Sequence, residues 1–157
     1  MEILKNVRIV WNLTNICPYN CPMCVASANK RIEKNIDKFR ILDSILSVDN
    51  TKLTIDFSGG DPLVCTEDIE IIRKATRILG KEKISISSTG LSLSKLSDQD
   101  ILELASGYDM TYDFPKKYKN FDVRDKRYNE YNYEQAIRLI TIGLDVDIFV
   151  PIRNIEK

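Results

Sequence analysis

Three cysteines within eight residues constrain this chain more than any other feature of its sequence. Cys17, Cys21 and Cys24 have the spacing C-x3-C-x2-C, and the two prolines between them discourage a regular helix. The mostly apolar residues 7–13 that precede them predict a buried strand. The segment is therefore predicted to be a loop, placed after a strand, whose thiols surround one metal centre.

Zinc binding and disulfide formation are the alternatives for these thiols. A structural zinc site usually has four protein ligands, whereas this chain has no histidine and only one further cysteine, Cys65. A disulfide within the segment would leave one of its three thiols over and would require an oxidising compartment. Neither alternative suits a set of three thiols well, and the choice between them and an iron–sulfur centre depends on a second motif downstream.

Length and composition indicate one soluble domain across residues 1–157, of which 43% are hydrophobic and 29% charged. Lys and Arg number 23, as do Asp and Glu, so the basic excess typical of nucleic-acid binders is missing. No apolar run is long enough to span a membrane, and the first residues do not resemble a signal peptide. We therefore expect a cytoplasmic protein in a reducing compartment, with neither nucleic acid nor membrane as a partner.

Strand and helix patterns alternate along the whole chain. We expect strands at residues 7–13, 52–57, 83–87, 110–113 and 145–150. We expect helices within residues 32–46, 66–80, 97–107 and 132–143, with Thr66, Ser97 and Asn132 as N-caps and Gly80, Gly107 and Gly143 at their ends. Repeated strand–helix units predict a parallel sheet whose loops meet at its carboxyl edge, where ligands bind. The cysteine loop should lie at that edge.

A second motif, residues 58–63 (Ser-Gly-Gly-Asp-Pro-Leu), follows the second expected strand. Adjacent glycines let the backbone approach a ligand closely, and an acid stands beside them. Alone, the motif would indicate an ordinary turn. Placed one strand–helix unit after C-x3-C-x2-C, it resembles the Gly-Gly-Glu motif of the radical S-adenosylmethionine (SAM) superfamily, with Asp61 in place of glutamate. The pattern is most similar to the branch that includes the molybdenum-cofactor cyclase and the peptide-modifying maturases.

The resemblance implies roles for particular residues. It makes Cys17, Cys21 and Cys24 the ligands of a catalytic [4Fe-4S] cluster whose open iron is chelated by SAM. It implies further contacts of the cofactor with Met23, Gly59, Gly60, Asp61, Pro62, Ser88, Thr89, Asp113 and Arg124.

These implied contacts differ in kind. Met23 matches a position that packs against the adenine, and Asp61 lies in the segment that binds the methionine amino group. Ser88 and Thr89 match a polar turn after the third strand, although their hydroxyls could equally cap that turn. Asp113 aligns with an acid at the fourth strand, without the usual following glycine, and Arg124 with an arginine of the branch named above, without its histidine.

Cys65 is expected to be a semi-buried structural thiol near a helix start, with a reactive thiol as the alternative.

The implied activity is reductive cleavage of SAM, with an electron from an external donor, to a radical that abstracts hydrogen from a substrate. Peptides, nucleotides and small metabolites all remain possible substrates. The alternatives are a non-catalytic iron–sulfur protein and a zinc-binding module or partner subunit of a larger complex. The implied fold is a partial (β/α) barrel of about five parallel strands, lacking the last unit of the (β/α)6 core. The free edge of the fifth strand would then be covered by self-association or by a partner subunit.

Overall fold

The computed structural model describes residues 6–21, 24–30, 36–47, 52–112 and 127–150. Five parallel strands form one sheet in chain order. They are β1 (Val7–Thr14), β2 (Leu53–Gly59), β3 (Ile84–Ser87), β4 (Gly107–Thr111) and β5 (Asp145–Phe149). The helices are α1 (Lys38–Leu46), α2 (Thr66–Leu79), α3 (Gly90–Leu93), α4 (Asp98–Leu104) and α5 (Tyr128–Thr141), with a 3-10 turn, η2 (Lys81–Lys83). The predicted α/β class and its five parallel strands are confirmed.

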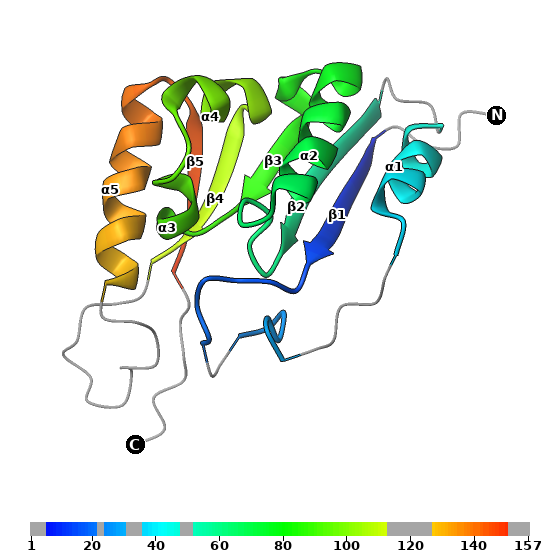
Figure 1. Ribbon diagram of the computed structural model, residues 1–157. Coiled ribbons are helices and arrows are strands. Elements are labelled where there is room, and N and C mark those ends of the chain that lie inside the picture. Colours follow the sequence, from blue (N-terminus) through cyan, green and yellow to red (C-terminus); the bar gives the residue numbers. More distant parts are fainter. Residues whose placement is uncertain (1–5, 22–23, 31–35, 48–51, 113–126, 151–157) are drawn as a thin grey trace.

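The helices lie on one side of the sheet, where they cover the hydrophobic core (Figure 1). Side chains alternate between the two faces of a strand, and in β2 the residues Leu53, Ile55 and Phe57 are completely buried. Ile86 of β3 and Tyr108 of β4 continue this buried layer. The helix-covered face is therefore the apolar side of the sheet.

The opposite face of the sheet carries mainly polar side chains, with exposed Val10 and Phe149 as exceptions. Alternation places the side chains of Arg8, Asp56, Ser87, Asp109 and Asp147 on it. Arg8 forms an ion pair with Asp56 on the neighbouring strand. The Ser87 hydroxyl donates to a carboxylate oxygen of Asp109 at 3.2 Å. One face of the sheet is thus buried under the helices, and the other is accessible to polar ligands.

One end of α4 and one end of α2 follow the sequence. Ser97 caps α4 by accepting a hydrogen bond from the Asp100 N–H at 3.1 Å, as expected. Gly80 ends α2 with a φ of 88°, which glycine adopts readily. The N-cap of α2 is Cys65 and not Thr66, which is the first helical residue.

Two expected boundaries in the second half of the chain are wrong. Gly107 does not end α4, which stops at Leu104; it begins β4, three residues earlier than predicted. Asn132 does not cap α5, which begins at Tyr128. Its side chain is 2% exposed and bonds to other parts of the chain, so a residue that resembled a cap is a buried bridge.

β5 lies at one edge of the sheet. It pairs with β4 from Asp145 to Phe149, and within the described residues it has no second neighbouring strand. The side chains of Ile148 and Phe149 are 51% and 56% exposed. Both observations agree with an edge that another strand could cover, and such a partner or second copy stays a prediction.

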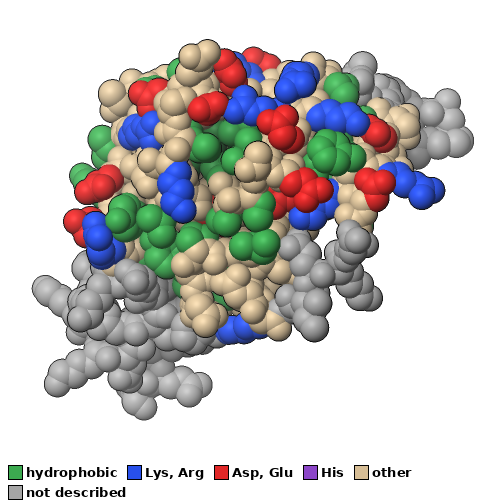
Figure 2. Space-filling model, in the orientation of Figure 1, with side chains coloured by type: hydrophobic (Ala, Val, Ile, Leu, Met, Phe, Trp, Pro, Cys, Tyr) green, Lys and Arg blue, Asp and Glu red, His purple; other side chains and the backbone are tan. Residues whose placement is uncertain are grey.

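Acidic and basic side chains are interspersed over the helix-covered side (Figure 2). This mixture is what equal numbers of acids and bases would produce, and it lacks the single-sign stripe of a nucleic-acid interface in the area shown. No helix in the described part of the chain is both long and apolar enough to cross a membrane.

Candidate metal and cofactor site

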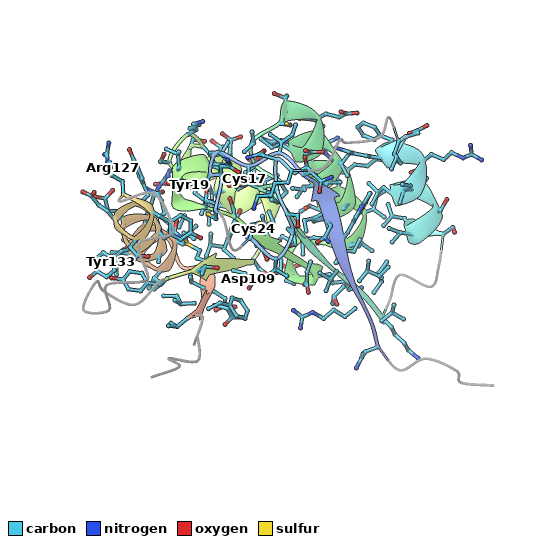
Figure 3. The ribbon with its side chains drawn as sticks, turned by 90° about the horizontal axis from the view of Figure 1, so that it is seen from below. Cys17, Tyr19, Cys24, Asp109, Arg127 and Tyr133 are labelled. Carbon is cyan, nitrogen blue, oxygen red and sulfur yellow. The ribbon has the colours of Figure 1, made fainter. Side chains whose placement is uncertain are left out.

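A cavity of about 410 Å³ lies at the carboxyl edge of the sheet. Its lining residues come from all five strands, from the segments that follow β1, β2 and β3, and from α5. Among them are Cys17, Cys21, Cys24, Gly59, Gly60, Ser88, Thr89, Asp109 and Tyr128. The structure therefore brings together the three cysteines and four of the residues expected at the cofactor. Figure 3 shows Cys17, Cys24 and Asp109 from the carboxyl ends of the strands.

The cysteine loop is built from successive turns. The Cys24 N–H donates to the Cys21 carbonyl oxygen at 3.1 Å, and the Ser27 N–H donates to the Cys24 carbonyl oxygen at 3.1 Å. The Ala28 N–H approaches the Cys24 sulfur at 3.5 Å. Asn29 then closes the loop with a φ of 60° and side-chain bonds to the backbone of Cys17 and Tyr19. Sequence reasoning missed Asn29, although asparagine tolerates the left-handed conformation better than most residues.

The three thiols of the cysteine loop, Cys17, Cys21 and Cys24, line one cavity. The described residues contain no group of three His, Cys, Asp or Glu side chains placed to ligate a single ion. Thiolates are the ligands that iron–sulfur clusters use. Burial raises the pKa of the Cys17 thiol to about 11, so metal binding there must displace a proton.

The two glycines pack against the chain that leads to Cys17. The Gly60 N–H donates to the Thr14 carbonyl oxygen at 2.6 Å, and the Asp61 N–H donates to that of Ile16 at 2.7 Å. A Cβ on Gly60 would lie 2.2 Å from the Ile16 oxygen, and one on Gly59 would lie 2.3 Å from the Thr14 oxygen. The close approach for which glycine was expected is therefore made to the entry of the cysteine loop, while both glycines also line the cavity.

Asp61 is a fully buried carboxylate with four hydrogen-bond donors around it. One oxygen accepts from the Ser88 hydroxyl at 2.8 Å and from the Leu63 N–H at 3.1 Å. The other accepts from the Thr89 N–H at 3.1 Å and the Thr89 hydroxyl at 2.6 Å. Asp61 thereby joins the turn after β2 to the turn after β3, behind the wall that Ser88 and Thr89 contribute to the cavity. Its contact with the cofactor, like that of buried Pro62, stays a prediction.

Asn132 of α5 supports the same wall. Its side-chain oxygen accepts from the Gly90 N–H at 2.6 Å, and its amide donates to the Thr111 carbonyl oxygen at 2.5 Å. A Cβ on Gly90 would lie 2.3 Å from the Tyr131 backbone, so α3 and α5 meet only because residue 90 is glycine. Asn132 thus ties the turn after β3 to the end of β4, a role that its sequence position did not reveal.

Two buried tyrosines attach the cysteine loop to α5. Tyr19, between the first two cysteines, and Tyr128 pack edge to face, with ring centroids 5.0 Å apart. Figure 3 shows Tyr19 on the α5 side of Cys17. Because Tyr128 also lines the cavity, α5 forms part of the site.

Asp109 connects this cavity to a second one on the polar face. The second cavity, of about 310 Å³, is lined by Asp109 with Arg8, Asp56 and Asp147 among others. Burial raises the pKa of Asp109, and the negative charges of Asp147 and Asp56 add to this effect, while the Ser87 hydrogen bond opposes it. Sequence reasoning missed Asp109 because an acid inside a strand carries no motif.

The remaining expected site residues are not part of the cavity as described. Met23, Asp113 and Arg124 lie outside the described residues. Cys65 is half-buried at the N-cap of α2, apart from the residues that line the cavity with the other three thiols.

Comparison with protein families gives a match to the model described as the radical SAM superfamily, over residues 11–152. A curated relative is 7,8-dihydro-6-hydroxymethylpterin dimethyltransferase from Methanocaldococcus jannaschii. It is 29% identical over 99 residues, which make up 60% of this chain and 19% of the relative.

Solved structures show the same fold. Native anSMEcpe with bound AdoMet and the Cp18Cys peptide matches with a TM-score of 0.61 at 18% identity, over 90% of this chain and 41% of its own. BtrN in an open conformation matches with a TM-score of 0.52 at 16% identity, over 96% of this chain and 58% of its own. The chain therefore spans less than two thirds of the length of each of these proteins.

Proposed function

This chain belongs to the radical SAM superfamily, and we propose that it is the core of an enzyme that holds a [4Fe-4S] cluster and SAM and starts radical chemistry on a substrate. The observation that carries the proposal is the shared cavity at the carboxyl edge of the sheet. It is lined by three cysteines from the loop after β1 and by residues of the turns after β2 and β3.

In this proposal Cys17, Cys21 and Cys24 would hold the cluster as thiolates, with SAM bound beside it. When bound, the two cofactors would supply radical hydrogen abstraction, which starts when one electron from an external donor passes through the cluster and cleaves SAM. The protein's contribution is ligation, orientation and exclusion of water. Tyr19 and Tyr128 contribute to the exclusion of water, because both are buried at the junction of the loop and α5.

The SAM contacts are proposed for the other wall of the cavity. Gly59, Gly60, Ser88 and Thr89 line it, and the hydroxyls of the last two donate to Asp61. Asp61 holds both hydroxyls from behind, so that their orientation is fixed before a ligand binds. Proposed contacts with Met23, Asp113 and Arg124 come from the superfamily pattern alone.

We propose that the substrate approaches along the polar face of the sheet. Asp109 lines both cavities, and residues from all five strands line the second one. A peptide, a nucleotide or a small metabolite would each meet hydrogen-bonding groups there. The electron comes from an external donor.

Anaerobic reconstitution with iron and sulfide, followed by addition of SAM and a reductant, tests the proposal. We expect about four iron and four sulfide per chain, visible charge-transfer absorption, and release of 5′-deoxyadenosine and methionine. Omission of the reductant is the matched control and should abolish both products. A cluster without cleavage would support the non-catalytic iron–sulfur alternative. Bound zinc with no visible absorption would support the zinc-binding module.

A further inference from the structure

We propose that Asn29 is a positioning residue for the metal centre, which fixes the Cys17 backbone so that its thiol is presented together with those of Cys21 and Cys24. This inference rests on the proposed function, because it concerns the same cluster. It adds a residue that lies outside the cysteine motif, five positions after its last thiol.

The Asn29 side chain binds the peptide groups on both sides of Cys17. Its oxygen accepts from the Cys17 N–H at 3.0 Å, while its amide nitrogen donates to the Cys17 carbonyl oxygen at 2.9 Å and to that of Tyr19 at 3.0 Å. Both ends of the amide are thus used on one short stretch of backbone. Such a two-ended contact fixes the direction of the Cys17 backbone, and with it the direction from which the thiol leaves.

The Asn29 backbone closes the loop at the same place. Its N–H donates to the Asn15 carbonyl oxygen at 2.7 Å, so residues 15–29 form a closed ring of chain that contains all three cysteines. The conformation needed for this closure has a φ of 60°, which asparagine accepts more readily than most residues. A ring closed in advance leaves less chain entropy to be lost when the thiols bind metal.

The closure also affects a second ligand. The residue before Asn29 is Ala28, whose N–H lies 3.5 Å from the Cys24 sulfur. Hydrogen bonds to cluster sulfurs stabilise the reduced form, which carries more negative charge, and so they raise the reduction potential. Asn29 therefore acts directly on Cys17 and, by holding Ala28 in place, indirectly on Cys24.

The test compares two glycine variants of the same loop. Asn29→Gly retains the left-handed backbone and removes all three side-chain hydrogen bonds. Ser27→Gly is the matched control, because Ser27 also has a positive φ, of 52°, and its side chain has no hydrogen bond within the described part of the chain. Thermal unfolding of both metal-free variants establishes whether each is folded.

The test measures the affinity of the protein for the cluster and the reduction potential of the cluster, neither of which depends on catalytic turnover. We expect the affinity of Asn29→Gly for the cluster to fall about ten- to a hundredfold, measured as the concentration of a ferrous chelator that removes half of it. We also expect its reduction potential, measured by spectroelectrochemical titration, to become more negative. Ser27→Gly should match the wild type in both measurements.

Equal chelator resistance and equal potential in Asn29→Gly and the wild type would overturn the inference and leave the proposed function standing. A wild-type protein that assembles no cluster would instead contradict the proposed function. If Asn29→Gly does not fold, Asn29→Asp decides the matter. It keeps the acceptor for the Cys17 N–H and loses both amide donors, so we expect an intermediate loss of affinity; wild-type behaviour in this variant would count against the inference.

Discussion

On the helix-covered face of the sheet, Phe57, Ile86 and Tyr108 are buried to within 1% of their surface. On the other face, Arg8, Ser87 and Asp109 retain access to solvent and interact through hydrogen bonds and charges. Burial of large apolar side chains provides most of the stability of a domain, whereas partly exposed polar pairs contribute little. The helix-covered face therefore stabilises the fold, whereas the other face is available to bind a ligand.

Truncation of one side chain on each face should test this comparison most clearly. Phe57 and Ser58 are neighbours in β2, and Phe57 is fully buried with its ring 5.8 Å from that of Trp11. We expect Phe57→Ala to lower the free energy of unfolding by about 3–5 kcal/mol, because it leaves a cavity in the core. Urea denaturation of the metal-free protein measures the change.

Ser58→Ala is the control, and its effect should lie within about 0.5 kcal/mol, as for other partly exposed substitutions. Comparable losses from the two variants would mean that the polar face is as important for stability as the core.

Asp61 combines properties of the two faces, because its side chain is polar but as fully buried as those of the core. Asp61→Asn replaces one acceptor oxygen by an amide that faces the donors of Ser88 or Thr89. We expect a loss of about 2–4 kcal/mol in the free energy of unfolding, from weakened charge-assisted bonds and an unsatisfied donor. If Asp61 also binds the cofactor amino group, the affinity for SAM by calorimetry should fall about ten- to a hundredfold.

Thr89→Ser keeps the hydroxyl and should remain within about 1 kcal/mol of the wild type in unfolding. Weaker SAM binding in Asp61→Asn with unchanged stability would show that the carboxylate is a ligand and not a brace.

The apolar face could be predicted from sequence because its signal is periodic and local. The buried residues of β2 alternate with polar ones, and glycine or serine marks several helix ends. The cysteine and Gly-Gly-Asp segments were recognisable for a related reason, since their chemistry depends on short fixed spacings. Both kinds of information lie within a few neighbouring residues, where a single sequence can be interpreted.

The supports of the site could not be predicted because they depend on contacts across the chain. Asn132 bonds to residues 21 and 42 positions away, and Asn29 to one 12 positions away. Tyr128 meets Tyr19 only after α5 has packed on the sheet. Each of these residues also fits an ordinary local role, such as a helix cap or a loop residue, so its tertiary contacts could not be recognised from the sequence.

Substitution of a cluster cysteine should have the opposite consequence to Phe57→Ala. It should change stability little and abolish the cluster. We expect Cys17→Ala, Cys21→Ala and Cys24→Ala to change the unfolding free energy of the metal-free protein by about 1 kcal/mol or less, because all three thiols are only half-buried. Each variant should fail to retain iron and sulfide after reconstitution. Cys65→Ala is the matched control and should keep the full cluster; loss of the cluster in that variant would revive a four-cysteine site.

The smallest expected effect concerns the charge of Asp109 on the polar face. Burial is the main cause that raises its pKa above the ordinary value of 3.8, with the charges of Asp147 and Asp56 acting in the same direction. A raised pKa means that folding favours the protonated acid. Its stabilising contribution is therefore complete below the unfolded pKa and disappears as the pH rises through the higher folded value.

At pH 7 the ionised carboxylate consequently costs stability, and Asp109→Asn should melt above the wild type. The rise in Tm should not exceed about 2 °C, because Asp109 is half-exposed and water screens its charge. The difference between the two proteins should shrink towards zero as the pH falls below 4, where both side chains are neutral. Ser87→Ala sharpens the test, since it removes the hydrogen bond that opposes the shift and should steepen the loss of stability with rising pH. A lower Tm for Asp109→Asn at pH 7 would instead show that the bonds of the ionised acid to its neighbours outweigh its burial, and that the polar face contributes to the fold as well as to the site.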